Sequence, residues 1–197
     1  ATLWWRDDDA AAPDPKLTDL VSLLGDADVV PGLAVIPSDV TAELLGSLVS
    51  ESAFAVMQHG VDHSNRMPEG HKKQELVDID AWDWREALVT ARDRVESIFG
   101  QHALPVLVPP WNRIDDAMLD HLAALGFRGI SCFGPRLKPQ IGDDLWVVNT
   151  HVDLVNWRGG RQFIGESAAI SALVEHLRGR REGRFDLAEP TGILSHH

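Results

Sequence analysis

Short apolar runs alternate with longer amphipathic stretches along the chain. The apolar runs have the length of strands and are continuous, which is typical of parallel strands buried on both faces. They cover residues 3–5, 32–36, 53–57, 105–108, 127–133, 145–149 and 192–195. Between them, helical spacing, capping residues and glycine stops predict helices over residues 16–24, 40–50, 83–99, 115–125 and 167–180.

This alternation of strands and helices predicts an α/β fold. Repeated strand–helix–strand units form parallel sheets, and about seven strands favour a (β/α) barrel. We find no internal repeat, low-complexity tract or linker, so residues 1–197 are expected to form a single catalytic domain. The chain stops directly after the last predicted strand, which leaves room for a further C-terminal helix.

Polar residues gather where the predicted strands end, which is where parallel α/β folds collect their reactive groups. The acidic triplet Asp7–Asp9 follows the first strand, His59 and His63 follow the third, and His196 follows the last. Adjacent carboxylates disfavour their own ionised forms unless a cation neutralises them. The triplet therefore predicts a bound metal ion, with further ligands supplied by other strand ends.

The two histidines suit a metal site formed by a loop. His59 and His63 are four residues apart, and Gly60 occupies the position where a helical zinc-protease motif has its glutamate. One aspartate and two histidines leave positions free for water and substrate, as in catalytic zinc sites. Zinc suits this ligand set best, and Co, Ni, Mn or Fe are admissible because such sites select by geometry and availability. A second aspartate of the triplet can act as general base and His196 as general acid.

Charge and composition limit the classes of molecule that the protein is expected to bind. The net charge of -12 argues against nucleic acid or an anionic membrane surface and favours a neutral or cationic substrate. No apolar run approaches the ~20 residues of a membrane-spanning helix, and no leader sequence opens the chain. Cys132 is the single cysteine, so no internal disulfide can form. We therefore expect a cytoplasmic location, although a signal peptide removed earlier would also fit, and the oligomeric state stays open.

Two of these motifs resemble those of the metal-dependent polysaccharide deacetylases, also called NodB-homology carbohydrate esterases. Asp8-Asp9-Ala10 is similar to the family's acidic motif, and His59 to His63 to its H-x-x-x-H motif. The resemblance implies Asp8 as general base and Asp9, His59 and His63 as metal ligands. A register one residue earlier, with Asp7 as base and Asp8 as ligand, is also open. The implied fold is a distorted (β/α) barrel of about seven strands, which agrees with the strand count.

The later motifs are similar to the family's in looser form. In Val108-Pro109-Pro110-Trp111 the family's arginine before the proline is absent, so Arg113, Arg6 or no residue would steady the catalytic aspartate. Leu194-Ser195-His196 is similar to the closing Leu-x-His motif, which implies His196 as the general acid. The runs 4–10 and 108–113 resemble a bacterial subgroup of the superfamily. By resemblance the substrate site is lined by Pro110, Trp111, Asn112, Arg113, Asp153 and Trp157.

These features predict a metal-dependent hydrolase that removes an N-acetyl or O-acyl group from a carbohydrate or related small molecule. A water activated by the metal would attack the acyl carbon. The absent arginine motivates an alternative, a non-catalytic carbohydrate-binding relative. A metal-free glycosidase that uses paired carboxylates is a third hypothesis. Lys73 and Glu75, which follow the histidine motif, are expected to belong to a solvated loop surface.

Overall fold

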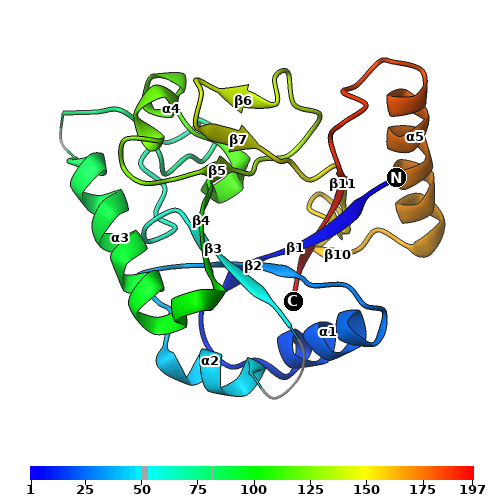
Figure 1. Cartoon of the computed structure of the whole chain (residues 1–197), viewed down its shortest axis with the longest axis horizontal. Helices are drawn as coiled ribbons and strands as arrows, with labels where there is room; N and C mark the ends of the chain where they lie inside the picture. The colour runs from blue at the N-terminus through cyan, green and yellow to red at the C-terminus, as the bar shows by residue number, and fades with distance from the viewer. Residues whose placement is uncertain (50–52, 81) are drawn as a thin grey trace.

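Most strands of the protein lie side by side in one curled, mostly parallel sheet (Figure 1). The computed structural model describes residues 1–49, 53–80 and 82–197. The order of the strands in the sheet is β6-β7-β5-β4-β3-β2-β1-β11-β8, and within it only β6 runs antiparallel to its neighbour. The sheet forms a half-barrel, which confirms the expected α/β class and distorted barrel.

The strands of the sheet are β1 (Leu3–Ala10), β2 (Gly32–Val35), β3 (Ala55–His59), β4 (Ala103–Val108), β5 (Gly129–Ile130), β6 (Gln140–Ile141), β7 (Leu145–Val147), β8 (Val152–Asp153) and β11 (Thr191–His196). A separate antiparallel pair is formed by β9 (Val155–Asn156) and β10 (Gln162–Phe163). The α-helices are α1 (Pro15–Asp26), α2 (Ala42–Leu48), α3 (Trp84–Phe99), α4 (Asp116–Leu122) and α5 (Glu166–Arg181). Two short 3-10 helices are η1 (Gly100–His102) and η2 (Pro110–Asn112).

Two of the helices, α1 and α3, begin at a capping aspartate. The Asp14 side chain accepts a hydrogen bond from Lys16 N at 2.7 Å, with Pro15 at the first position of α1. Asp83 caps α3 in the same way. The helix predicted over 40–50 is shorter than expected, and its predicted last residue, Ser50, lies outside the described residues.

The first strand differs most from the prediction. We expected a strand over residues 3–5 followed by an acidic turn, whereas β1 continues to Ala10. Asp7 and Asp8 are part of the strand, paired in register with Ser195 and His196 of β11, and both side chains are buried. The charged residues can extend a buried strand because each of these two carboxylates has partners.

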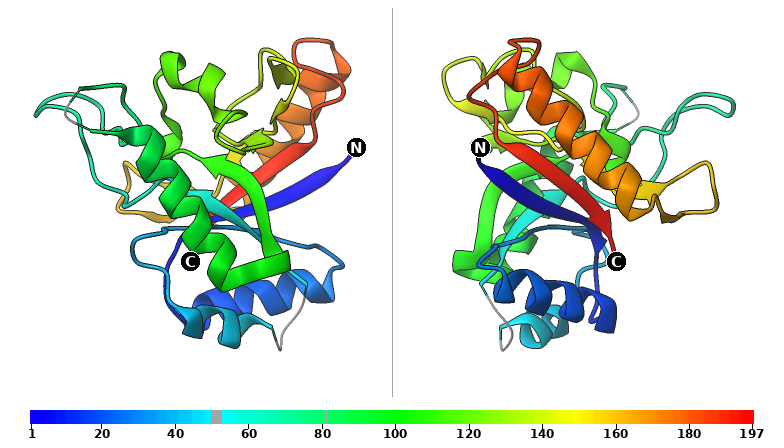
Figure 2. Two further views of the ribbon diagram at one scale, coloured as in Figure 1. Left: turned by 60° about the vertical axis from the view of Figure 1, so that its left-hand side comes forward. Right: turned by 90° about the vertical axis from the view of Figure 1, so that its right-hand side faces the viewer.

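Helices α1 to α4 cover one face of the sheet, because the strand residues that they pack against are neighbours in the parallel register. One buried apolar cluster joins α1 and α2 to β2 and β3, and a second joins α3 and α4 to β4 and β5. Helix α5 lies beside β11 in the views of Figure 2. In the described parts of the chain, none of the helices is both long enough and apolar enough to cross a membrane.

Candidate active site

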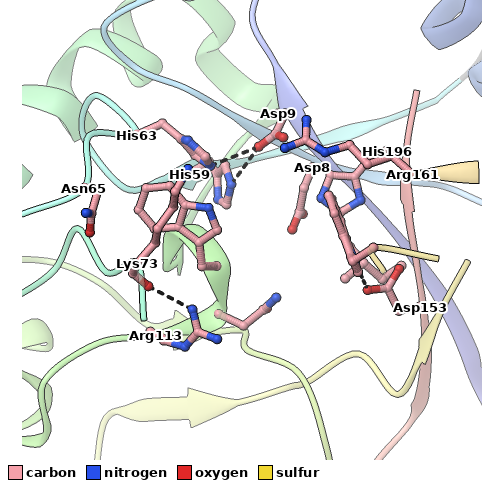
Figure 3. A pocket seen from close by; sticks show the side chains of 14 residues that line it. Asp8, Asp9, His59, His63, Asn65, Lys73, Arg113, Asp153, Arg161 and His196 are labelled. Carbon is pink, nitrogen blue, oxygen red and sulfur yellow. Dashed lines mark hydrogen bonds and ion pairs between the residues drawn. The ribbon is translucent and has the colours of Figure 1, made fainter. Parts of the chain in front are cut away.

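A pocket of about 520 Å³ opens at the carboxyl ends of β1, β3 and β11 (Figure 3). The preferred site residues from the sequence line it except Pro110, which is buried in η2, and the alternative base Asp7 does not line it. The lining residues are Asp8, Asp9, His59, His63, Asn65, Lys73, Trp111, Asn112, Arg113, Asp153, Trp157, Arg161, Leu194 and His196.

Asp9, His59 and His63 present their ligand atoms to one point. One nitrogen or oxygen from each lies within 4.8 Å of the others. Asp9 Oδ1 is 3.1 Å from His59 Nε2 and 3.3 Å from His63 Nε2. His59 Nδ1 donates to the carbonyl oxygen of Val108 at 2.9 Å, because a carbonyl can only accept. In the neutral ring this leaves the Nε2 lone pair directed at the cluster, as in a metal-binding histidine.

Asp9, His59 and His63 also shift one another's pKa values. Burial alone would raise the pKa of Asp9, but the hydrogen bond from His59 and the nearby imidazoles lower it to about 2. Burial lowers the pKa of His59, yet the hydrogen bond to Asp9 and the charges of Asp8 and Asp9 outweigh it and raise the pKa overall. The pKa of His63 is lowered by burial and by the neighbouring His59. Asp9 is therefore anionic across the neutral pH range and is the natural partner for a cation.

Asp8 is held by Arg6, two residues earlier on the same face of β1. Arg6 Nε is 2.8 Å from Asp8 Oδ1 and Nη2 is 3.0 Å from Oδ2, so the pair is bidentate and almost fully buried. Arg6 also donates to Ser131 and to Asn112 Oδ1. Arg113 instead donates to the carbonyl oxygen of Lys73. The sequence left open whether Arg113, Arg6 or no residue would contact the aspartate. In the structure, Arg6 forms the ion pair with Asp8.

Asp7 faces away from the pocket. Its carboxylate accepts hydrogen bonds from Ser195 Oγ and His197 Nδ1, each at 2.6 Å, and its side chain is fully buried. Successive residues of a strand point to opposite faces, so Asp8 and Asp7 cannot both enter the pocket. A break in the β1–β2 register between Asp7 and Ala10 then lets Asp9 turn towards the histidines.

His196 lies across the pocket from His63 (Figure 3). Its ring meets Trp157 edge-on, with 4.8 Å between the ring centroids. Trp157 Nε1 donates a hydrogen bond to Asp153 Oδ2 at 2.7 Å. Asp153 therefore fixes the indole ring that packs against His196. His196 Nδ1 is buried and has no hydrogen-bond partner among the described residues.

Backbone strain is concentrated at this pocket. Six non-glycine residues of the described chain have positive φ, and all of them except Asp28 line the pocket. The five are Asp9, His63, Trp111, Asn112 and Arg161. Such conformations cost about 1–3 kcal/mol each and persist where the surroundings over-determine them, which is common at functional sites.

The sequence interpretation missed several residues of the site. Lys73, expected on a solvated surface, is exposed and also lines the pocket, as do Asn65 and Arg161, which were not proposed. Glu75, assigned to the same surface, is fully buried, and its Oε1 accepts hydrogen bonds from Val61 N and from the next backbone amide, both at 2.9 Å. These residues come from loops, whose folded path has no periodic signal in the sequence.

Comparisons with known proteins support the fold. No family model and no curated protein matches the sequence. The structure is similar to a polysaccharide deacetylase from Bacillus cereus, with a TM-score of 0.57 and 14% identity over 99% of this chain and 78% of that one. It is also similar to a family 4 carbohydrate esterase from Streptomyces lividans in complex with acetate, with a TM-score of 0.59 and 13% identity over 99% and 78%.

A third solved structure is a family 4 acetyl xylan esterase from Clostridium thermocellum in complex with a cobalt ion. Its TM-score is 0.52, with 13% identity over 98% of this chain and 73% of that one. At these identities the likeness is one of fold. The chain has the fold of polysaccharide deacetylases and family 4 carbohydrate esterases, so the resemblance first drawn from its motifs is confirmed at that level.

Proposed function

We propose that the protein is a metal-dependent hydrolase that removes an N-acetyl group, or an O-acyl group, from a carbohydrate or related small molecule. The observation that carries this proposal is the convergence of Asp9, His59 and His63 beside a second carboxylate, Asp8, that is held separately by Arg6. The fold shared with deacetylases and acetyl esterases supports it.

The residues present fit a divalent metal ion. Asp9, His59 and His63 form a carboxylate and imidazole set of the kind that binds zinc, and the orientation of His59 leaves its Nε2 free. The cobalt ion in the acetyl xylan esterase complex fits the same expectation. Zinc is the first candidate, with Co, Ni, Mn and Fe as alternatives. When bound, such an ion would acidify a water molecule and polarise the acyl oxygen.

The protein groups around this point divide the proton transfers between them. Asp8 accepts a proton from the attacking water, and Arg6 fixes the orientation of its carboxylate. His196, on the last strand, donates a proton to the departing amine or alcohol. Trp111 and Trp157 form walls against which the apolar face of a sugar ring can pack.

Replacement of Asp9 tests the metal assignment. Zinc binding by the purified protein would be measured by calorimetry, and acetate release from an acetylated chromogenic sugar would be measured in parallel. We expect Asp9→Ala to lose stoichiometric zinc binding and to lower acetate release by at least a hundredfold, since a ligand of the reaction centre is removed. Asp7→Asn, whose side chain lies outside the pocket, is the matched control and should retain zinc binding. If Asp9→Ala kept both properties while folded, the proposal would be wrong.

The alternative of a non-catalytic carbohydrate-binding relative was motivated by the absent arginine. Arg6 contacts Asp8 in the way that such an arginine would, so the absent arginine no longer favours a non-catalytic protein. Asp8→Asn separates the two functions, because it removes the proton acceptor and keeps the shape of the side chain. A catalytic protein loses acetate release in this variant and still binds zinc, whereas a binding protein releases no acetate even as the wild type.

A further inference from the structure

The pocket brings cationic side chains close to three carboxylates, Asp8, Asp9 and Asp153. Three of its lining residues are Lys73, Arg113 and Arg161, here called the cationic rim, whereas the whole chain has a net charge of -12. In residues 1–49, 53–80 and 82–197, none of the three has a carboxylate oxygen within 4.0 Å of its nitrogens. Arg66 and Arg136, which do not line the pocket, are paired with Asp62 and Asp186.

The carboxylates of the pocket are engaged elsewhere. Asp8 is paired with Arg6, and Asp9 lies against the two imidazoles. Asp153 accepts hydrogen bonds from Val155 N and Trp157 Nε1. These contacts do not involve the rim, so its three cations stay available to a group that enters the pocket.

The rim has a definite arrangement with the tryptophans. Lys73 Nζ lies 5.7 Å from the ring centroid of Trp111, and Arg161 Cζ lies 5.8 Å from that of Trp157. Figure 3 shows Lys73 and Arg113 on one side of the acidic centre and Arg161 on the other. Arg113 donates to the carbonyl oxygen of Lys73 at 2.8 Å, which anchors the loop that carries the lysine. Each wall thus combines an indole face with a cation.

We infer that the substrate is a saccharide that carries an anionic group, a carboxylate or a phosphate, close to its acyl group. This inference rests on the proposed function, because it concerns the ligand of the same pocket. The indoles suit the sugar ring, and the rim suits its anionic substituent through charge-assisted hydrogen bonds. A local positive field inside a concave site can attract an anion although the distant surface is acidic. The neutral or cationic substrate expected from net charge is replaced by an anionic one.

Binding of three related probes tests the inference without relying on turnover. The probes are N-acetylglucosamine, its 6-phosphate, and N-acetylmuramic acid, which carries a carboxylate. Titrations of the zinc-loaded protein would be followed by calorimetry and by the acetyl methyl proton resonance of each probe. We expect at least one anionic probe to bind roughly tenfold more tightly than the neutral one at low salt, and the advantage to shrink as salt is added. The better anionic probe tells whether carboxylate or phosphate is recognised.

Charge variants assign the preference to the rim. Lys73→Gln and Arg161→Gln should each reduce the ratio of anionic to neutral affinity severalfold, whereas Arg181→Gln, at the exposed end of α5, should leave it unchanged. Because all three remove one positive charge, an equal effect of Arg181→Gln would mean that only net charge matters and would overturn the inference. The absence of any anionic preference in the wild type, whether every probe binds equally or none binds, would overturn it as well. Acetate release is scored separately, so a protein that prefers anionic probes and hydrolyses none refutes the proposed reaction alone.

Discussion

At the scale of single residues, the Arg6–Asp8 pair shows how a strand can carry a buried carboxylate together with the cation that stabilises it. The two residues are separated by one position, so the alternation of the strand puts both on the same face. Both are almost fully buried, with exposures of 0% for Arg6 and 2% for Asp8. A buried carboxylate is tolerated only with a well-aligned partner, which makes the arginine as necessary to the fold as to the site.

The first consequence concerns Arg6→Met. Removal of the guanidinium leaves Asp8 buried without its partner, and breaking such a pair costs about 3–5 kcal/mol. Chemical denaturation should show this loss at neutral pH. Arg178→Met is the matched control, because its pair with Glu175 is about half exposed and is expected to contribute at most about 1 kcal/mol. Equal losses in the two variants would contradict the structural role given to Arg6.

At the scale of elements, the loop after β3 depends on a buried carboxyl group. Glu75 Oε1 accepts two backbone hydrogen bonds from the turn between the two site histidines. Its other oxygen, Oε2, is buried and has no hydrogen-bond partner among the described residues. Gly60 is required beneath it, because a Cβ there would lie 2.1 Å from Oε2 and the residue has a φ of 60°. Glu75 therefore stabilises the turn that sets the distance between His59 and His63.

Burial raises the pKa of Glu75 from 4.5 to about 7, with a contribution from Asp62. Between these two values the unfolded chain is ionised and the folded protein keeps the proton, so the free energy of unfolding should fall as pH rises. The loss amounts to about 3 kcal/mol. Glu75→Gln, which cannot ionise, should flatten this slope when unfolding is measured from pH 4 to pH 8. Glu69→Gln, in an exposed loop position, should keep the wild-type slope, and a wild-type slope in Glu75→Gln would refute the explanation.

The sequence predicted elements well where they are long and periodic. Helices α3 and α5 lie within two residues of their predicted ends. The buried apolar face of α3 accounts for its prediction, whereas α5 buries only His176 and Gly179. The two-residue strands β6, β8, β9 and β10 were missed because no period can be detected over two positions. The end of β1 was misplaced because local charge argues for a turn, whereas Arg6, Ser195 and His197 make burial of the carboxylates possible.

The site residues that could be predicted are those with a local signal in the sequence, and those that were missed have none. Asp9, His59 and His63 stand at strand ends and belong to recognisable spacings, so they could be proposed from the sequence. Lys73 and Arg161 reach the pocket, and Glu75 reaches the turn between the histidines, through loops whose positions only the tertiary structure defines. The sequence also left the partner of Asp8 open. Because β1 continues past Asp8, Arg6 lies on the same face of the strand and forms the ion pair, whereas Arg113 does not.

At the scale of the whole molecule, the first strand and the last strand described are neighbours. β11 pairs in parallel with β1 over its whole length and supplies His196 to the pocket. Asp7 connects the two strands further through Ser195 and His197. The pocket is therefore assembled from both ends of the domain.

The contact between Asp7 and His197 predicts a pH dependence of the whole fold. Burial lowers the pKa of His197, but the hydrogen bond and charge of Asp7 outweigh it and raise the pKa above 6.5. A raised histidine pKa stabilises the folded protein fully below pH 6.5, and this stabilisation is lost as pH rises through the folded pKa. His197→Gln should remove about 1.5–3 kcal/mol at pH 6 and less at pH 9, measured by denaturation. His71→Gln, in an exposed loop, should show no such difference, and equal losses at both pH values in His197→Gln would contradict the prediction.

The position of β1 in the sheet also bears on synthesis at the ribosome. Roughly 180 residues separate β1 from β11, so at about 5–20 residues per second β1 waits roughly 10–40 s for its second neighbour. During that time one side of the strand has unpaired backbone groups, which invite pairing with other chains. Charged side chains on an unpaired edge discourage such association. Arg6, Asp7 and Asp8 would thus protect the nascent chain from aggregation before β11 pairs with β1.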